Sequence, residues 1–574
     1  MLKNIKEDER LNIINHSCAH LLAQAVKHLY PKALFWVGPV IEEGFYYDID
    51  LGDDVIKEED LEKIEKEMKK ISKDGKRIYR EELSREEALE KFKNDPYKID
   101  LINNMDENTV ISCYTQGDFT DLCRGPHVDS VKELKYFKLL KVSGAYFKGD
   151  SKNKMLQRIY GICFETEEDL KNHLNFLEEA KKRDHKKLGK ELGLFMFSEY
   201  GPGFPFWLPN GMILRKQLED FWYREHTKEG YLFVKTPIML NRDLWEVSGH
   251  WANYKENMYT SIIDEKEFAI KPMNCPGGML IYKNELHSYK DLPLRVGELG
   301  HVHRHEASGA LNGLFRVRTF TQDDAHIFMT EEQIESEIIK LINFIDRIYK
   351  LFNLSYTIEL STRPDKYIGD ISVWDKSEEA LMNACKKAGK DCKINPGDGA
   401  FYGPKLDFHV KDSLGRVWQC GTIQLDMNLP ERFDLTYVAS DGSKKRPIML
   451  HRVIFGSIER FIGIITEHYA GAFPTWLAPV QINVIPVNNE FHLEYSKKIY
   501  SKLLENNFRV NLDDRDEKVG YRMRESVVKK YPYTLILGQK EIDDNKISYR
   551  KYGSEETVTV SLEEFIDLIK KEII

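Results

Sequence analysis

Apolar positions in the first third of the chain recur at helical spacing, with β-like runs between the helical stretches. A helix is predicted from Asn15 to Leu29, and a second, amphipathic helix with a charged, solvated face from Leu61 to Ile71. Residues 111–164 hold short β-like runs instead. A long helix is then predicted from Thr166 to Leu192, because acids crowd its first turn and lysines its end, as the helix dipole favours.

The middle of the chain changes to glycine, proline and aromatic residues from Leu192. A helix over residues 212–229 is predicted to lead into a strand, GYLFVKTPIM. Residues 296–328 are predicted to form a strand, a long loop and a second strand that begins at Phe315. The next helix begins at a Thr-x-x-Gln capping box that opens at Thr330.

The last part of the chain, from about residue 478, alternates strand and helix patterns. Alternation of this kind is typical of a separate small α/β domain. Together with the mixed strands and helices before it, the pattern predicts an α+β multidomain fold.

Composition narrows the class of protein. The chain has 574 residues, of which 42% are hydrophobic and 31% charged, so we expect roughly three to four packed domains. A formal net charge of −9 means that any nucleic-acid surface must be local. The eight cysteines are scattered and form no CxxC pair, which favours a reducing compartment over a disulfide scaffold. The N-terminus has no apolar core and no run is long enough to span a bilayer, so we predict a cytoplasmic protein without a membrane partner.

The predicted hairpin carries the first candidate chemistry. Arg304 and Arg316 flank its loop, with an acid at Glu306. Guanidinium groups are planar, permanently charged donors that suit phosphate oxygens. A charged surface hairpin is the alternative explanation. An Arg-x-Glu turn that returns on an arginine-containing strand resembles motif 2 of the class II aminoacyl-tRNA synthetases.

Two further segments strengthen this resemblance. The helix before GYLFVKTPIM and the Pro237 within that strand resemble motif 1, which implies a homodimer. HRVIFGSIERFIGIITEH, from His451, places Gly456 at a close turn and Arg460 in the first turns of a helix, and it resembles motif 3. Three motifs in the correct order are more specific than any one of them, and the chain has no GxxxxGK[ST] P-loop. The resemblance implies a catalytic core built on an antiparallel β-sheet.

The same resemblance assigns the ATP chemistry. Arg304 would contact the α-phosphate, Arg316 the γ-phosphate, and Phe320 would stack on adenine opposite Arg460. Mg²⁺ would accompany ATP, because charge concentrates at phosphorus when a carboxylate attacks it. The implied ATP-binding residues are Arg304, Glu306, Arg316, Phe320, Gln419 and Arg460, and the implied catalytic residues are Arg304, Arg460 and Lys405.

The amino acid is suggested by KPMNCPGG, QDDAHIF and the start of motif 3, all of which closely resemble the threonyl-tRNA synthetase family. That family holds one catalytic Zn²⁺ per subunit, which here implies Cys275, His326 and His451 as ligands. A three-residue set leaves one position open. Threonine could fill it with its amine and hydroxyl, whereas valine lacks the hydroxyl. The implied threonine-binding residues are Asp324, which receives the amino group, and Gln322, Tyr402 and Gln424.

The N-terminal region holds another cluster. His16 and His20 lie four residues apart on one helix face, and Cys123 and His127 are also four apart. From the residues alone this is a candidate four-ligand zinc site. The surrounding sequence resembles the family's editing domain, which hydrolyses mischarged seryl-tRNA(Thr) and is usually described as metal-free, so we favour a site without metal. Asp121 belongs to the implied editing set, and Lys148 is a weaker candidate.

The C-terminal domain resembles the anticodon-binding domain of class IIa synthetases. Glu541 and Arg550 match the positions that read anticodon bases, which is chemistry suited to splayed single-stranded loops. Arg522 and Arg524 are candidates for phosphate contacts.

The resemblance covers essentially the whole chain and implies four parts. These are an editing domain (1–165), a helical linker (166–190), a class II catalytic domain (191–477) and an anticodon-binding domain (478–574). It begins at the editing domain, which implies a form without the family's leading ubiquitin-like domain. The expected partners are tRNA(Thr), ATP and L-threonine. Two alternatives stay open: a paralogue that binds RNA without catalysis, and a class IIa enzyme for proline or another amino acid.

Overall fold

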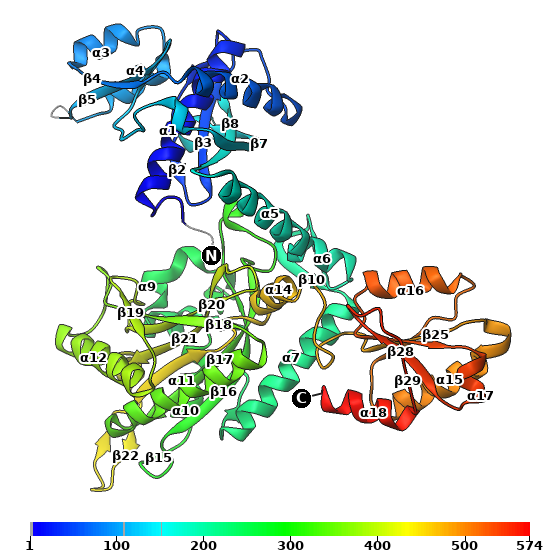
Figure 1. Ribbon diagram of the computed structural model, residues 1–574. Coiled ribbons are helices and arrows are strands. Elements are labelled where there is room, and N and C mark those ends of the chain that lie inside the picture. The colour runs from blue at the N-terminus through cyan, green and yellow to red at the C-terminus, as the bar shows by residue number, and fades with distance from the viewer. Residues whose placement is uncertain (1–3, 107–108, 151, 574) are drawn as a thin grey trace. The chain divides into compact units, whose positions relative to one another are not determined.

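The computed structural model describes residues 4–106, 109–150 and 152–573. The chain divides into two compact units, Met1–Glu179 and Ala180–Ile574 (Figure 1). In the described parts of the chain, no helix is both long and apolar enough to cross a membrane.

The first unit is built around a helix, α1 (Glu9–Leu29), on an antiparallel sheet. The helix begins six residues before the predicted start, because the Asp8 carboxylate accepts a hydrogen bond from the Leu11 amide and caps it. The sheet has the order β1-β3-β8-β7, with β2 beside β3. Its strands are β1 (Leu34–Phe35), β2 (Val40–Ile41), β3 (Gly44–Asp50), β7 (Tyr136–Tyr146) and β8 (Met155–Phe164). The predicted amphipathic helix is α2 (Leu61–Asp74), and its apolar face packs on the same core.

A smaller sheet with the order β4-β5-β6 completes the first unit. It consists of β4 (Ile78–Leu83), β5 (Ile111–Gln116) and β6 (Phe119–Leu122), with helices α3 (Arg85–Lys91) and α4 (Pro96–Asn103). Strand β6 ends immediately before Cys123 and therefore sets the position of that thiol.

The predicted helix from Thr166 to Leu192 is interrupted, so the prediction of one continuous helix is wrong. The structure has α5 (Glu167–Arg183) and α6 (His185–Glu191), with Asp184 between them at φ −49° and ψ 119°. The Asp184 carboxylate accepts a hydrogen bond from the Lys186 amide. Aspartate favours such a cap over a helix interior, and α6 begins at the residue after this cap.

The second unit contains an eight-stranded sheet with the order β11-β16-β17-β24-β21-β20-β18-β19. The edge pairs β11–β16 and β18–β19 are parallel and the pairs between them are antiparallel, which confirms the predicted antiparallel core. The strands are β11 (Leu232–Phe233), β16 (Leu294–His303), β17 (Thr319–Met329), β18 (Ser355–Ser361), β19 (Cys392–Asn395), β20 (Lys405–Lys411), β21 (Val417–Asp426) and β24 (Ile448–Val453).

Helices cover this sheet and form the largest apolar core of the chain. They include α7 (Pro209–Lys228), α11 (Ile334–Leu351), α12 (Ile371–Lys387) and α14 (Ile458–His468). The apolar face predicted for the helix after Thr330 is buried, as expected, and belongs to α11. The capping box forms between Thr330 and Gln333, although it opens a short 3₁₀ turn that precedes the α-helix.

Two predicted strands are shorter than expected. The second strand of the hairpin starts at Thr319 rather than Phe315, and residues 315–318 belong to the loop. Its apolar alternation reflects a loop that packs inward, since Leu314 is fully buried and Val317 nearly so. The segment GYLFVKTPIM joins the eight-stranded sheet only at β11, and its last residue, Met239, begins β12 (Met239–Asn241) in another sheet; Pro237 lies between the two strands and lacks the amide proton that a ladder needs.

The C-terminal part has the predicted α/β architecture. Its sheet has the order β26-β25-β27-β28-β29. Strand β25 is parallel to β26 and β27, and strand β28 is antiparallel to β27 and β29. The elements are β25 (Ile482–Pro486), α15 (Asn489–Glu505), β26 (Val510–Leu512), α16 (Val519–Val528), β27 (Tyr533–Leu537), α17 (Gln539–Asp543), β28 (Ile547–Lys551), β29 (Val558–Val560) and α18 (Leu562–Lys571). Only the short α17 was not predicted.

Candidate functional site

Three predicted metal ligands meet at one end of the eight-stranded sheet. His326 on β17 and His451 on β24 are directly paired across neighbouring strands. Cys275 is the first residue of α10 (Cys275–Lys283). All three side chains are buried, and their ligand atoms lie within 4.8 Å of one another.

The chemistry of this set fits a zinc ion. Nε2 of His326 is buried and has no hydrogen-bond partner among the described residues. Nε2 of His451 donates to the Asp426 carboxylate at 2.8 Å, which leaves Nδ1 with a free lone pair. Burial, followed by Asp324 and Asp426, raises the pKa of the Cys275 thiol well above its usual value, so the site favours a cation that stabilises the thiolate. One sulfur and two imidazoles form a ligand set typical of zinc.

A cavity of about 260 Å³ is lined by Cys275 and His451, two of the three predicted ligands. Asp324 lies on its wall and accepts a hydrogen bond from Asn274 Nδ2 at 3.1 Å. Gln424 is fixed by donation from Nε2 to the Gly403 carbonyl at 3.0 Å. The predicted residues that line this cavity are Gln322, Asp324, Tyr402, Lys405 and Gln424, together with Cys275 and His451.

A second cavity, of about 270 Å³, brings the predicted ATP residues together. Its walls include Arg304, Glu306, Arg316, Phe320, Gln419 and Arg460. The two cavities share Arg304, Gln322, Thr422 and Val453. They therefore meet at the Arg304 guanidinium, which lies 5.1 Å from the centre of the Phe320 ring and donates from Nε to the Pro272 carbonyl.

Arg460 is held at the far wall of this second cavity. Gly456 has φ +80°, and a Cβ there would approach the Cys420 carbonyl oxygen at 2.9 Å, so glycine is required at this turn. Ser457 then caps α14 by accepting from the Arg460 amide. Burial and the neighbouring Arg316 lower the pKa of Arg460, whose Nε has no hydrogen-bond partner among the described residues. A pocket of this kind favours a polyanion.

Asp426, which accepts the hydrogen bond from His451, was not among the residues predicted from the sequence. It lies two residues after Gln424 on β21 and therefore faces the same side of the sheet. Alternation along that strand was the signal that could have identified it. Asn274, directly before the predicted metal ligand Cys275, was also missed.

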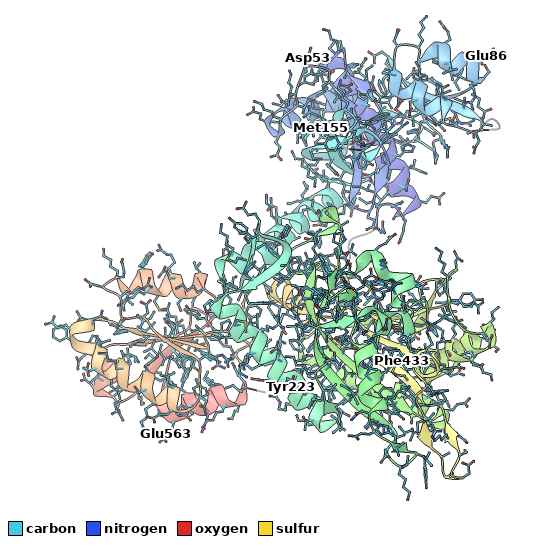
Figure 2. All side chains as sticks on the ribbon, turned by 180° about the vertical axis from the view of Figure 1, so that it is seen from behind. Asp53, Glu86, Met155, Tyr223, Phe433 and Glu563 are labelled. Atoms are coloured by element: carbon cyan, nitrogen blue, oxygen red, sulfur yellow. The ribbon has the colours of Figure 1, made fainter. Side chains whose placement is uncertain are left out.

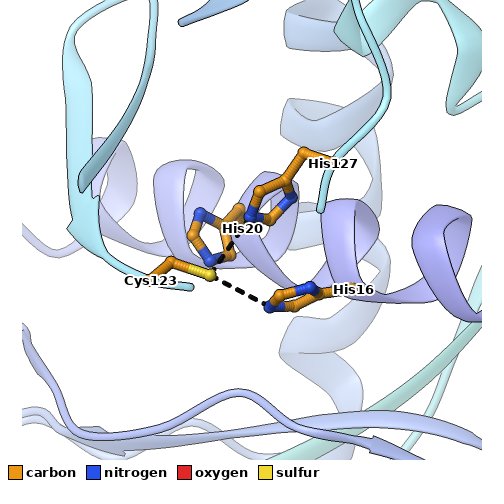
Figure 3. A group of neighbouring side chains, drawn as sticks. All are labelled: His16, His20, Cys123 and His127. Atoms are coloured by element: carbon orange, nitrogen blue, oxygen red, sulfur yellow. Dashed lines mark hydrogen bonds between the residues drawn. The ribbon is translucent and has the colours of Figure 1, made fainter. Parts of the chain in front are cut away.

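The first unit contains the other predicted cluster (Figure 3). Cys123 Sγ lies 3.2 Å from His16 Nε2 and 3.2 Å from His127 Nε2. His20 completes the set, and the four ligand atoms lie within 4.8 Å of one another. His16 and His20 come from one face of α1, and Cys123 and His127 from the segment after β6, as Figure 3 shows.

Burial keeps the whole cluster uncharged at neutral pH. It is the largest cause that lowers the pKa of His16, His20 and His127. Neighbouring imidazoles lower the pKa of His20 and His127 further, and Lys98 also lowers that of His20. Burial also raises the pKa of Cys123 to about 12. His16 Nδ1 donates to the Pro126 carbonyl, so its Nε2 presents a lone pair to the Cys123 thiol.

Asp121 lies behind this cluster and is almost fully buried. Its carboxylate is 3.7 Å from His20 Nε2 and 2.5 Å from Lys98 Nζ, and it also accepts from the Tyr47 hydroxyl. Lys98 was not predicted at this cluster. It lies in a charge-rich segment whose composition suggested exposure to solvent, although the lysine itself is buried. The predicted Lys148 instead pairs with Asp100 at 2.7 Å, and its side chain is 45% exposed.

The residues of the C-terminal part that are predicted to contact RNA differ in how far their side chains are exposed to solvent. Arg524 and Arg550 line a hollow of about 480 Å³. Glu541 accepts from the Gly538 amide and from the Ser548 hydroxyl, which fixes the start of α17. Arg522 is buried and donates to the Asp513 and Pro486 carbonyls, so the prediction of a phosphate contact there is wrong.

Three protein-family models match the chain. The model for the tRNA synthetase class II core domain (G, H, P, S and T) matches residues 259–469. The anticodon binding domain model matches residues 481–572. The model for the threonyl and alanyl tRNA synthetase second additional domain matches residues 111–160, which include Asp121 and Cys123.

Curated relatives match nearly the whole chain. A threonine–tRNA ligase of Fusobacterium nucleatum is 59% identical over 574 residues, covering 99% of this chain and 92% of its own. One from Clostridioides difficile is 56% identical and covers 100% of this chain and 90% of its own. Among solved structures, the RNA binding domain of threonyl-tRNA synthetase from Cryptosporidium parvum is 41% identical with a TM-score of 0.66, covering 68% of this chain and 98% of that one.

Proposed function

This chain belongs to the threonyl-tRNA synthetase family, and from that premise we propose that it is an editing-competent threonine–tRNA ligase. It joins L-threonine to ATP, transfers the threonyl group to tRNA(Thr), and hydrolyses mischarged seryl-tRNA(Thr) at a separate site. The observation that carries the proposal is that the cavity beside Cys275, His326 and His451 meets the arginine-lined cavity at Arg304. We assign residues 1–165 to editing, 166–190 to the linker, 191–477 to catalysis and 478–574 to anticodon binding.

The arginines perform the activation step. The threonine carboxylate forms a bond to the α-phosphorus of ATP, the bond between that phosphorus and the bridging oxygen breaks, and pyrophosphate leaves with the electron pair. Arg304 at the junction of the cavities stabilises the charge that develops on the α-phosphate. Arg316 and Arg460 hold the leaving phosphates, and Phe320 stacks on adenine. Lys405 lines the threonine cavity, and Mg²⁺ accompanies the bound ATP.

The threonine cavity selects the amino acid. Cys275, His326 and His451 would hold Zn²⁺, which supplies an open position for the amine and hydroxyl of threonine and rejects valine. Asp324 would accept a hydrogen bond from the amino group. Gln322, Tyr402 and Gln424 shape the rest of the cavity.

Serine makes editing necessary, because it keeps the amine and the hydroxyl and lacks only a methyl group, worth ~1–3 kcal/mol. His16, His20, Cys123 and His127 form a neutral set in which Cys123 is hydrogen-bonded to His16 and to His127, and His20 lies beside Asp121. We favour a metal-free site, as the resemblance to the family's editing domain implies. The neutral imidazoles can accept a proton from the water that attacks the seryl ester.

The remaining parts serve tRNA and assembly. Arg550, exposed on β28, would contact anticodon bases, and Glu541 would shape that surface. We propose a homodimer built on motif 1. The eight free cysteines and the need for tRNA and ATP support a cytoplasmic location.

ATP–pyrophosphate exchange tests the proposal directly. We expect exchange with threonine and not with valine in zinc-replete protein, and one zinc per chain by metal analysis. Zinc-replete protein that shows no threonine-dependent exchange would contradict the function, and exchange that depends on proline would favour the alternative class IIa enzyme.

A further inference from the structure

The His185 side chain joins three segments that lie far apart in the sequence. His185 is the first residue of α6 and is 1% exposed. Its Nδ1 lies 2.6 Å from Glu467 Oε1 near the end of α14. Its Nε2 lies 2.9 Å from the backbone nitrogen of Leu314, in the loop between β16 and β17. One imidazole thus connects the start of α6, the motif 3 helix and the motif 2 loop.

The hydrogen bonds fix the tautomer of this imidazole. The Leu314 amide can only donate, so Nε2 of His185 carries the lone pair and Nδ1 carries the proton. Nδ1 therefore donates to the Glu467 carboxylate, whose other oxygen lies 2.6 Å from the Arg416 guanidinium. Asp184, His185 and Glu467 offer ligand atoms within 4.8 Å of one another, but both imidazole nitrogens are already used, so the group is not a metal site.

The loop is shaped to meet His185. Gly313 has φ +47°, and a Cβ at that position would lie 2.1 Å from His185 Nε2, so only glycine permits the approach. The Phe315 ring then packs between His185 and Trp418, with ring centres 4.1 Å and 4.2 Å apart. Leu314, Phe315 and Arg316 all line the arginine-lined cavity. The backbone is held from one side while Arg316 faces the cavity.

We propose that His185 is a positioning residue that fixes the loop 311–317 so that Arg316 is ready to bind the phosphates of ATP. The inference rests on the proposed adenylate-forming function. A loop that is already ordered loses less conformational entropy when ATP binds, so the anchor raises ATP affinity. No residue of this loop lines the threonine cavity, so threonine affinity is independent of the anchor.

The test compares His185→Ala, His185→Gln and, as a matched control on an exposed position of the same helix, Lys187→Ala. In threonine-dependent ATP–pyrophosphate exchange we expect His185→Ala to raise the KM for ATP about tenfold, because the Leu314 amide loses its acceptor. The KM for threonine stays unchanged. His185→Gln restores most of the ATP affinity, since its amide oxygen can accept from Leu314, and Lys187→Ala matches the parent chain.

A second measurement reports on the order of the loop independently of catalytic activity. Hydrogen–deuterium exchange of unliganded protein should show faster exchange of the amides in residues 311–317 for His185→Ala than for the parent or Lys187→Ala. An unchanged ATP KM together with unchanged exchange in a folded His185→Ala chain would overturn the proposal. Equal rises in both KM values, without rescue by glutamine, would also overturn it and assign a general structural role. A parent chain without threonine-dependent exchange would defeat the proposed function, whereas the amide measurement would still decide the anchor.

Discussion

At the scale of single residues, the two chemical sites depend on partners that decide which imidazole nitrogen is available. The Asp426 carboxylate accepts a hydrogen bond from Nε2 of His451, and the Pro126 carbonyl accepts one from Nδ1 of His16. In each case the opposite nitrogen faces the site. The ligand or proton acceptor is therefore set by a residue that does not touch the substrate.

Asp426→Asn tests this dependence at the proposed zinc site. Asparagine keeps the size of the side chain but accepts the His451 hydrogen bond without charge, so we expect zinc affinity to fall roughly 10–100-fold. A competition titration against a chelator measures it. Asp434→Asn is the control, because that side chain is 76% exposed. Equal zinc affinity in both variants would remove Asp426 from the site.

The editing cluster gives a second prediction. We expect the double variant His20→Ala and Cys123→Ala to charge tRNA(Thr) with threonine at the parent rate and to accumulate seryl-tRNA(Thr). The reason is that the cluster belongs to the first compact unit, whereas both catalytic cavities belong to the second. Release of serine from preformed seryl-tRNA(Thr) is the measurement. Deacylation at the parent rate would refute the assignment.

At the scale of elements, an ion-paired cluster ties the three motifs together. Arg215 of α7 donates to Glu459 of α14 at 2.7 Å and to the Thr321 hydroxyl of β17 at 2.6 Å. The second Glu459 oxygen accepts from the Thr321 amide. Glu459 is 1% exposed and directly precedes Arg460. The cluster therefore also fixes the position of Arg460 on α14.

Removing one partner of this cluster should be costly. We expect Arg215→Ala to destabilise the second unit by about 3–5 kcal/mol, because Glu459 is left buried and uncompensated. Lys216→Ala, which removes an exposed pair with Asp220, should change stability by less than about 1 kcal/mol. Urea unfolding followed by tryptophan fluorescence compares the two. Equal midpoints would show that Glu459 does not depend on Arg215.

A buried histidine on α7 predicts how stability depends on pH. His226 is 1% exposed, and burial, with help from Arg452, lowers its pKa well below the usual value. The unfolded chain therefore binds a proton that the folded chain does not, and stability is lost as pH falls below about 6.5. We expect His226→Gln to weaken this loss by up to about 1.4 kcal/mol per pH unit. Melting temperatures at pH 5.0 and 7.5 test it, and an unchanged difference between them would contradict the prediction.

Sequence patterns captured the elements whose apolar face is periodic, such as α2 and α11, and the residues that sit within recognisable motifs. They did not reveal the break at Asp184, because a capping aspartate and an exposed helical aspartate look alike in a charged segment. They placed Arg316 on a strand, because a loop that buries Leu314 and Val317 imitates strand alternation. Lys98 and Asp426 were missed for a related reason, since their places beside the two clusters depend on contacts across the fold and not on spacing along the chain.

At the scale of the whole molecule, the chain separates aminoacylation of tRNA from hydrolysis of the mischarged ester. Each compact unit has its own core and its own cluster of histidine and cysteine. The clusters differ in what surrounds them. The cavity beside Cys275 meets a second cavity that is lined by arginines, whereas burial keeps the cluster around Cys123 neutral.

Dimerisation is the property of the whole molecule that the surface of the second unit predicts. β11 is an edge of the eight-stranded sheet, and next to it Leu232 is 59%, Ile238 43% and Met239 40% exposed. Phe233 packs edge-on against Tyr223 of α7, which Figure 2 labels, and both rings are partly exposed. An open edge flanked by apolar side chains is a surface that natural proteins cover.

We therefore expect light scattering to give the parent chain twice its 67.2 kDa mass, and Leu232→Glu with Phe233→Glu to give a single chain mass. Ile394→Glu is the matched control. It lies on β19, the opposite edge of the same sheet, and is 63% exposed, so it places the same charge on an apolar edge residue outside motif 1. The control should stay dimeric. If the β11 variant is dimeric and the β19 variant is monomeric, the interface lies at the β19 edge instead. A monomeric parent chain would contradict the homodimer proposal.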